Sequence, residues 1–362
     1  MRAILASAGL LVLAGSAVAG RPTVHTLRRS PNGPIAAVAQ NNGVAAWLTS
    51  GGTKGCDEVH VMSPGKPDRS LPQPSSPTMT CLWDIQPGQS QLAIASRLST
   101  ALWTLRGNQS SPFDQVLAAS LGGPERRLEQ FSHNSDGTGR WLGGVTGAGR
   151  TLAYSWYDIE YVNPTACLSS GRCKQKIADG GIHIVTRSSD TSLPGALPAL
   201  QLAASGDRIA YIPATTANSG RASSGHNATI YVVDAGAGNV VGTVAVNGEP
   251  AAIALTSHML VVLLDQGGPQ NRISWYTPTG SKRLGTVLVS RNAAPQLAVS
   301  NRLIVYRVFR NIEAIPIQGG GIRMLAKTSA DNTIGLSLAN GRLLWAVNNA
   351  NSGRLRALVV GQ

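Results

Sequence analysis

The sequence predicts an all-β protein, a seven-bladed β-propeller whose blades are four-stranded antiparallel sheets. Three observations lead to this prediction: apolar residues alternate with a period of two, tight turns interrupt them, and the combined unit recurs seven times. Alternation of this kind is typical of strands, and a repeat of about 40 to 50 residues is typical of propeller blades. We expect residues 20–362 to form this one domain.

The composition agrees with many short strands. The chain has 362 residues, of which 43% are hydrophobic and 14% charged, with 41 Gly and 20 Pro. Such a profile favours strands joined by tight turns over long helices, and it leaves enough apolar residues for a substantial core. Low charge combined with this hydrophobic content also argues against disorder.

Residues 229–255, "TIYVVDAGAGNVVGTVAVNGEPAAIAL", contain the repeating unit most clearly. An apolar strand is followed by a turn at Gly236 and Gly238, a second strand, a break at 248–250 and a third strand. Related stretches recur at 36–48, 91–105, 141–156, 200–212, 251–264, 295–308 and 333–347. Their aligned aromatic or branched residues are Trp47, Trp103, Tyr154, Tyr211, Val261, Val305 and Trp345, separated by steps of 40 to 57 residues.

The ring is expected to close through the N-terminal strand. Blade seven supplies three strands before the chain reaches Gln362, so it lacks a fourth. Residues 23–29, "TVHTLRR", alternate well enough to be that strand. We predict that they pair beside residues 354–360, which closes the ring and leaves no bare edge there.

The 229–255 unit resembles the YVTN class of β-propeller repeats, whose units contain a strand, an Asp-containing turn, a Val-rich strand and a Gly-Pro turn. Elsewhere the blades are similar to the more general WD-repeat-like and TolB-like propeller pattern, without a clear Trp-Asp signature. The resemblance implies a propeller fold. It implies little about function, because one fold hosts many activities.

Residues 1–19 have the features of a signal peptide. Arg2 precedes a short apolar run, and Ala17-Val18-Ala19 form a small-residue cleavage site. We therefore expect a secreted or periplasmic protein. No Cys stands directly after the cleavage site, and no later apolar run is long enough for a transmembrane segment.

An even number of cysteines in an exported chain suggests disulfides. Cys56, Cys81, Cys167 and Cys173 allow three pairings. The short separation of Cys167 and Cys173 favours a local bridge, with Cys56 paired to Cys81. The spacing matches no common zinc pattern, so no metal site or other cofactor is expected.

The charge balance suggests anionic surroundings. The chain has 31 Lys and Arg against 18 Asp and Glu, a formal net charge of +13. A basic exported protein prefers partners such as acidic polysaccharide, cell-wall polymer, lipid headgroups or nucleic acid. The alternative is that the charge only maintains solubility, because the basic residues are scattered rather than gathered in runs. No specific nucleic-acid motif is present.

The long insertions are expected on one face of the ring, at 49–57, 73–90, 162–180 and 213–228. Loops on a rigid scaffold are common binding sites. The strongest candidate is the segment 155–176, "SWYDIEYVNPTACLSSGRCKQK", in which aromatic and charged residues suit a sugar or peptide ligand. Its candidate binding residues are Trp156, Tyr157, Asp158, Glu160, Tyr161, Arg172, Lys174 and Lys176, joined by His226 from the blade-four insertion. The alternative is that the bridges only stabilise loops and that about half of these aromatic residues belong to the core.

The search for catalytic motifs finds none. GxSxG, HExxH, Walker-type and EF-hand patterns are absent, and "HNSDGTG" at 133–139 is better explained as a polar turn than as a metal site. The leading hypothesis is a non-enzymatic binding or interaction scaffold, expected to be a monomer, whose partner is an anionic polysaccharide, a cell-envelope component or another protein. The alternatives are a structural role in an envelope assembly, or a lyase or hydrolase of anionic glycans or glycopeptides in which His226, Asp158 and Glu160 converge near the channel.

Overall fold

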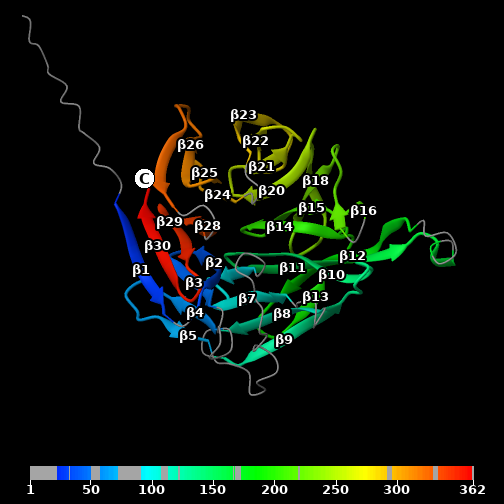
Figure 1. Cartoon of the computed structure of the whole chain (residues 1–362), viewed down its shortest axis with the longest axis horizontal. Helices are drawn as coiled ribbons and strands as arrows, with labels where there is room; N and C mark the ends of the chain where they lie inside the picture. Colours follow the sequence, from blue (N-terminus) through cyan, green and yellow to red (C-terminus); the bar gives the residue numbers. More distant parts are fainter. Residues whose placement is uncertain are drawn as a thin grey trace, which may run out of the picture.

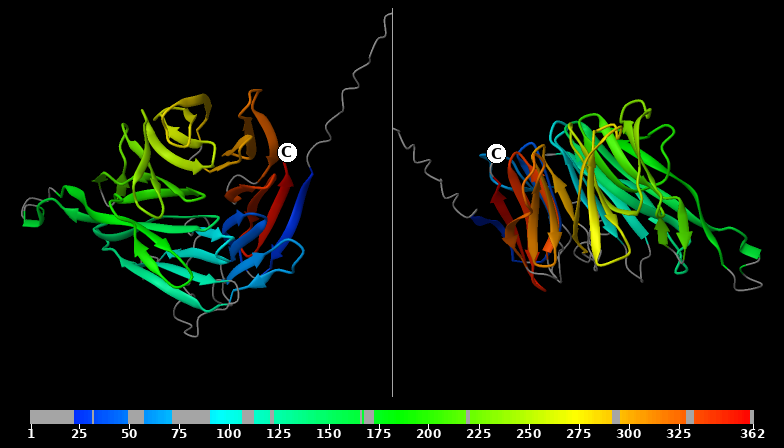
Figure 2. Two further views of the ribbon diagram at one scale, coloured as in Figure 1. Left: turned by 180° about the vertical axis from the view of Figure 1, so that it is seen from behind. Right: turned by 90° about the horizontal axis from the view of Figure 1, so that it is seen from above.

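The molecule is a ring of seven antiparallel sheets, as expected from the repeats (Figures 1 and 2). The computed structural model describes residues 23–31, 33–49, 58–71, 91–106, 113–120, 123–165, 167, 173–218, 221–291, 296–328 and 333–360. No helix among these residues is long and apolar enough to cross a bilayer.

Five blades have four strands each, and consecutive strands pair in order from the centre of the ring to its rim. Blade one contains β2 (Ile35–Asn41), β3 (Val44–Thr49), β4 (Glu58–Met62) and β5 (Arg69–Ser70). Blade two contains β6 (Leu92–Ala95), β7 (Thr100–Arg106), β8 (Phe113–Ser120) and β9 (Glu125–Ser132). Blade four contains β14 (Ala199–Ser205), β15 (Arg208–Pro213), β18 (Thr229–Asp234) and β19 (Val240–Ala245). Blade five contains β20 (Glu249–Leu255), β21 (Leu260–Asp265), β22 (Gln270–Tyr276) and β23 (Arg283–Ser290), and blade six contains β24 (Leu297–Val299), β25 (Leu303–Val308), β26 (Asn311–Pro316) and β27 (Arg323–Lys327).

The second strand of each blade is the most deeply buried, because neighbouring blades cover both of its faces. In β21, five consecutive residues from Leu260 to Leu264 are buried. Six blades place a buried aromatic ring on this strand: Trp47, Trp103, Tyr154, Tyr211, Tyr306 and Trp345. In blade six the ring belongs to Tyr306, one residue after the aligned Val305, which is itself fully buried. These rings fill the spaces between blades and define the core.

Glycines let the inner strands approach one another around the centre. A Cβ atom on Gly147 would lie 2.8 Å from the carbonyl oxygen of Ile94 on β6. A Cβ on Gly143 would collide with the carbonyl oxygen of Ala199 on β14. Because no side chain fits at either position, the inner strand of blade three packs backbone-to-backbone against both neighbours.

Blade seven takes its outer strand from the other end of the chain. Its sheet has the order β28 (Thr333–Ala339), β29 (Arg342–Asn348), β30 (Gly353–Val359) and β1 (Val24–Ser30), counted outward from the centre. β1 runs antiparallel to β30, from Val24 opposite Leu358 to Ser30 opposite Gly353, with a bulge at Leu27. This is the strand pairing that the missing fourth strand of blade seven led us to expect.

Polar contacts tie blade seven to blade one. The backbone amide of Ile35 donates to Asn348 Oδ1 at 2.9 Å, and Asn348 Nδ2 donates back to the Ile35 carbonyl at 2.8 Å. Gln40 Nε2 donates to the carbonyl of Arg342 at 2.6 Å. Both Asn348 and Gln40 are buried, so these bonds satisfy polar groups at the junction where the two ends of the chain meet.

Blade three has two strands more than the other blades. It contains β10 (Gly139–Ala148), β11 (Thr151–Tyr161), β12 (Gln175–Val185) and a three-residue outer strand, β13 (Asp190–Ser192). The blade-four insertion, expected as a loop, forms a hairpin of β16 (Thr216–Asn218) and β17 (Arg221–Ser223) that pairs with β12 through Ala217 and Gln175. The predicted Cys167–Cys173 disulfide is present at the end of this blade. Cys56 and Cys81 lie outside the described residues.

Candidate binding surface on blade three

A two-stranded arm projects from blade three. β11 and β12 have 11 residues each, whereas the corresponding second strand of blade four has six. The extra length forms the arm, residues 156–161 and 175–181, which extends beyond the ring (Figures 1 and 2). The Cys167–Cys173 bridge, with Cα atoms 4.5 Å apart, cross-links the connection between the two strands. The described residues 156–161 and 175–181 of the arm therefore form two paired strands.

Arg140, Trp156 and Asp158 form one packed group at the base of the arm. Residues 140 and 158 are opposite one another across β10 and β11, and Arg140 Nη2 lies 3.2 Å from Asp158 Oδ2. The Arg140 guanidinium also lies 4.0 Å from the centre of the Trp156 ring, a cation–π distance. The hydrogen bond to Asp158 raises the pKa of Arg140. Trp156 is half-buried, so part of its surface belongs to the interior.

Asp136 links the loop before β10 to the arm. Its Oδ1 accepts hydrogen bonds from the Thr138 amide and hydroxyl, at 2.8 and 2.7 Å, and these bonds lower its pKa. Its Oδ2 accepts from the Tyr161 hydroxyl at 2.9 Å, and this bond raises the pKa of Tyr161. Gln175 Nε2 donates to the Asp136 carbonyl at 3.2 Å. The segment 133–139 is thus a polar turn that braces the arm.

The remaining rings of this surface are stacked or half-buried. The rings of His133 and Trp141 lie parallel, with centroids 3.7 Å apart, and Trp141 Nε1 donates to the Gly137 carbonyl. Tyr157 lies across from Trp141 on the neighbouring strand and is half-buried. The expectation that some of the aromatic residues of 155–176 contribute to packing agrees with this arrangement.

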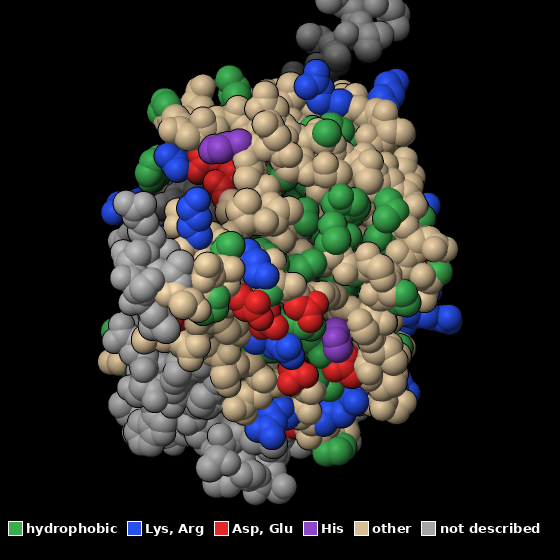
Figure 3. Space-filling model, turned by 90° about the vertical axis from the view of Figure 1, so that its right-hand side faces the viewer, with side chains coloured by type: hydrophobic (Ala, Val, Ile, Leu, Met, Phe, Trp, Pro, Cys, Tyr) green, Lys and Arg blue, Asp and Glu red, His purple; other side chains and the backbone are tan. Residues whose placement is uncertain are grey.

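The outer part of the arm is charged. Glu160 and Lys176 face one another across β11 and β12, with Lys176 Nζ 4.0 Å from Glu160 Oε2. Both side chains are more than half exposed, and Lys174 is also exposed. Figure 3 shows acidic and basic side chains interleaved on this side of the molecule. Arg172 lies outside the described residues.

His226 does not join the arm residues. It is an exposed residue between β17 and β18, and its backbone carbonyl accepts a hydrogen bond from the Gly248 amide at 2.7 Å. No hydrogen bond or ion pair between described residues connects His226 with Asp158 or Glu160. Those two carboxylates are instead paired with Arg140 and Lys176.

Sequence reasoning did not assign Arg140 or Trp141 to this surface. Both lie on β10, the inner strand, and reach the site because β10 pairs with β11. Knowledge of the register between the two strands of the hairpin 139–161 would have placed Arg140 opposite Asp158. That register depends on the bulge between Leu142 and Val145, which alternation alone does not reveal.

A second polar group in blade three serves the interior. The Tyr154 hydroxyl donates to Asp190 Oδ2 at 2.7 Å, and His183 Nδ1 lies 2.9 Å from Asp190 Oδ1. Burial raises the pKa of Tyr154. Because the Tyr154 side chain is fully buried, these bonds satisfy a core hydroxyl and attach the short strand β13 to the blade.

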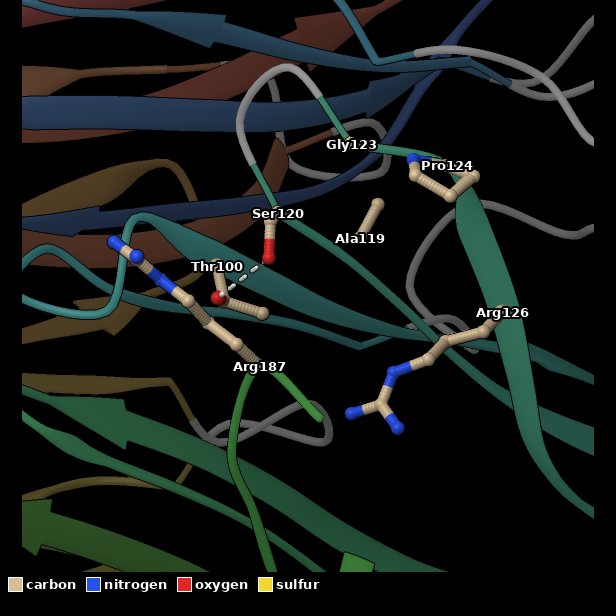
Figure 4. Close-up of a pocket in the computed structure, with 7 residues that line it drawn as sticks. All are labelled: Thr100, Ala119, Ser120, Gly123, Pro124, Arg126 and Arg187. Atoms are coloured by element: carbon tan, nitrogen blue, oxygen red, sulfur yellow. Dashed lines mark hydrogen bonds between the residues drawn. The ribbon is translucent and has the colours of Figure 1, made fainter. Parts of the chain in front are cut away.

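A cavity of about 120 Å³ lies between blades two and three. Its lining includes Arg126, Arg187 and the hydroxyl groups of Thr100 and Ser120, which lie 3.3 Å apart (Figure 4). Figure 4 shows the two guanidinium groups well apart from each other. Arg126 donates to the carbonyl of Thr186 at 2.6 Å, and Arg187 donates to the carbonyl of Leu98 at 2.7 Å. The two arginines join the blades and do not converge on a ligand.

Comparison with known proteins supports the fold alone. Neither a protein-family model nor a curated protein matches the chain. Among solved structures, the chain is similar to the β-propeller domain of Cps50 (Swd1) from Myceliophteria thermophila, with a TM-score of 0.54 and 11% identity over 94% of this chain and 100% of that domain. A chain of the mitotic checkpoint complex matches with a TM-score of 0.56 and 13% identity, over 99% of both chains.

A third similar structure is the acylaminoacyl peptidase of Pyrococcus horikoshii, with a TM-score of 0.53 and 8% identity. The match covers 91% of this chain but 52% of the peptidase, so the chain spans about half of that protein. These similarities, all at low identity, agree with the β-propeller fold of the structure.

Proposed function

We propose that this protein is an exported binding scaffold that docks a protein partner of the cell envelope through the blade-three arm. The observation that carries the proposal is the arm itself: two extended strands project from the ring, and a disulfide and a packed Arg140–Trp156–Asp158 group hold them. A rigid projection loses little conformational freedom when it binds, which favours recognition.

The chemistry of the arm suits a polypeptide. Exposed Glu160 and Lys174 offer both signs of charge, and half-exposed Trp156 and Tyr161 offer apolar surface beside them. Interfaces between proteins combine aromatic anchors with a polar rim in this way. The similarity to a chain of the mitotic checkpoint complex is compatible with such a role, since that protein is part of an assembly.

Site-specific photo-crosslinking in the producing cell tests this proposal. A photoreactive residue replaces Glu160 or Lys176 on the arm, and the matched control replaces exposed Thr286 on β23. We expect a discrete protein adduct from the two arm positions and none from position 286. Adducts of equal yield at all three positions, or none at the arm, would overturn the proposal.

The alternative of a propeller enzyme has one supporting observation, the similarity to a peptidase propeller. The three residues expected to converge do not do so, because Asp158 and Glu160 are paired within the arm and His226 lies apart. If the protein is an enzyme, its reacting groups are other residues.

A further inference from the structure

We propose a second binding surface, distinct from the blade-three arm, at which the junction of blades six and seven binds an acidic polysaccharide. We call this surface the six–seven seam. It consists of Phe309 and Arg310 on blade six and of Arg29, Arg354 and Arg356 on blade seven. The inference goes beyond the proposed function, because it concerns another ligand at another site.

The positive charge of the chain is concentrated in these blades. Residues 291–362 contain nine Lys and Arg against two Asp and Glu, whereas residues 32–290 contain 18 against 16. β1 adds Arg28 and Arg29 to blade seven because it pairs with β30. The basic residues look scattered along the sequence, but the fold gathers them. Most of the net charge of +13 therefore belongs to one sector of the ring.

Three arginines share one face of blade seven. Arg29 is directly opposite Arg354 across β1 and β30, and Arg356 is two residues further along β30. Arg356 is also opposite Trp345, which packs with Val305 and Ile312 of blade six, so this face is turned toward blade six. Arg28 faces the other way and pairs with Asp68 of blade one at 3.2 Å.

Among the described residues, no carboxylate forms an ion pair with an arginine of the seam. Two like charges placed directly opposite in a sheet repel one another. Arg29 and Arg354 are both exposed, and no described carboxylate forms an ion pair with either. The described acidic residue of blades six and seven, Glu313, instead accepts a hydrogen bond from Tyr306 at 2.8 Å. An anionic ligand would supply the missing countercharge.

Blade six displays an aromatic ring at the same end of the seam. Phe309 is 64% exposed and has a φ of 48°, a left-handed conformation that is unfavourable for a bulky residue. Buried Arg307 holds this turn, because its Nε donates to the Phe309 carbonyl at 3.1 Å and its Nη1 to the carbonyl of Thr333 on blade seven at 2.9 Å. The hydrogen bonds of buried Arg307 thus fix the turn in which the exposed phenyl ring of Phe309 lies next to Arg310.

This combination favours a polysaccharide over single-stranded nucleic acid. Planar guanidinium groups bind carboxylate and sulfate groups in bidentate fashion, and the face of one aromatic ring can stack on a sugar. Single-stranded nucleic acids are usually held by several aromatic rings, on which successive bases stack. Among the described residues of blades six and seven, Phe309 is the one exposed aromatic side chain. The charges also follow the two outer strands of blade seven, β30 and β1, which suits an extended chain.

The test measures binding of the mature protein to a heparin decasaccharide at several salt concentrations. The seam variant is R29Q/R354Q/R356Q, and the matched control, R127Q/R208Q/K282Q, removes three exposed charges from blades two, four and five. We expect the seam variant to lose affinity by at least about tenfold and the control by less than about twofold. F309A, with charge unchanged, should lose several-fold.

Three results would overturn the inference. Equal losses of affinity in the seam and control variants would mean that heparin binding depends only on the net charge of the protein. Loss in an R172A/K174A/K176A variant, with the seam variant unaffected, would assign the polymer to the arm. Equally tight, seam-dependent binding of single-stranded DNA of the same charge would show that the seam does not select a polysaccharide. Because melting temperatures are compared in parallel, a misfolded variant is recognised before its affinity is interpreted.

Discussion

The seam between blades two and three and the seam between blades six and seven are both rich in arginine, but they use it differently. In the first, Arg126 and Arg187 donate to backbone carbonyls of the neighbouring blade. In the second, Arg307 donates in the same way to the Thr333 carbonyl, but Arg29 and Arg354 face one another and no described carboxylate forms an ion pair with either. The number of arginines at a junction therefore says little about ligands until their protein partners are known. Arginine that joins blades is structural, whereas arginine without a partner is available for an anion.

Among these predictions, removing β1, which contributes Arg29 to the six–seven seam, should lower the free energy of unfolding the most. Deletion of residues 20–30 removes β1 and its backbone bonds to β30. It also removes the packing of Val24 against blades six and seven and of Leu27 against blades seven and one. We expect a loss of roughly 3–6 kcal/mol in the free energy of unfolding. Calorimetry of the truncated and full-length mature proteins measures this loss. An unchanged melting temperature would show that β1 is not needed to close the ring.

A pair of single substitutions contrasts the two seams directly. Arg126→Gln removes the donor that satisfies the Thr186 carbonyl and should destabilise the fold by about 1–2 kcal/mol. Arg29→Gln relieves a like-charge contact and should change stability by less than about 0.5 kcal/mol, in the stabilising direction at low salt. Urea titrations of both variants at low and high salt give the comparison. Equal destabilisation would mean that Arg29 also has a structural role.

On the opposite face of β9 from Arg126, Glu125 gives blade two a dependence on pH. Burial raises the pKa of Glu125 from 4.5 to about 7, and its Oε1 is buried without a hydrogen-bond partner. The folded state therefore holds a proton that the unfolded chain has released, so stability should fall as pH rises from about 4.5 to 7. Since Glu125 is partly exposed, solvent screening reduces the effect to about 1 kcal/mol.

Glu125→Gln keeps the shape of the side chain and removes its charge. We expect this variant to lose the decline in stability between pH 4.5 and 7 that Glu125 causes. Glu129→Gln, which removes a carboxylate from the same strand, serves as the matched control. If the Glu125 variant retains the full pH dependence, another group is responsible for it.

The strands could be predicted because their cause is local. The apolar pattern of residues 208–213 predicts a strand from the residues of that segment alone, and β15 has the same bounds. The outer strand of blade seven was also predictable, because counting strands left one position empty. The strand in the blade-four insertion was not: β16 pairs with β12 through one residue pair, and no apolar pattern accompanies it.

The binding surfaces were less accessible to sequence reasoning, since they depend on register between distant strands. The arm was recognised from its aromatic and charged residues, but its partners Arg140 and Asp136 come from β10 and the turn before it. The six–seven seam was missed altogether. Arg29 and Arg354 are far apart in sequence, and they come together only when β1 is placed beside β30.

The position of β1 also has a consequence for how the chain folds. Thr26 and Arg356 bond across a sequence separation of 330 residues, so this contact forms only when nearly the whole chain is available. Contacts of such separation form late, because the entropy of closing the intervening loop opposes them. During that wait β1 is an unpaired edge strand, the kind of segment that starts aggregation. Its exposed His25 and Arg29 are the polar residues that protect such a strand, so the same arginine that we assign to ligand binding also keeps the unfinished ring soluble.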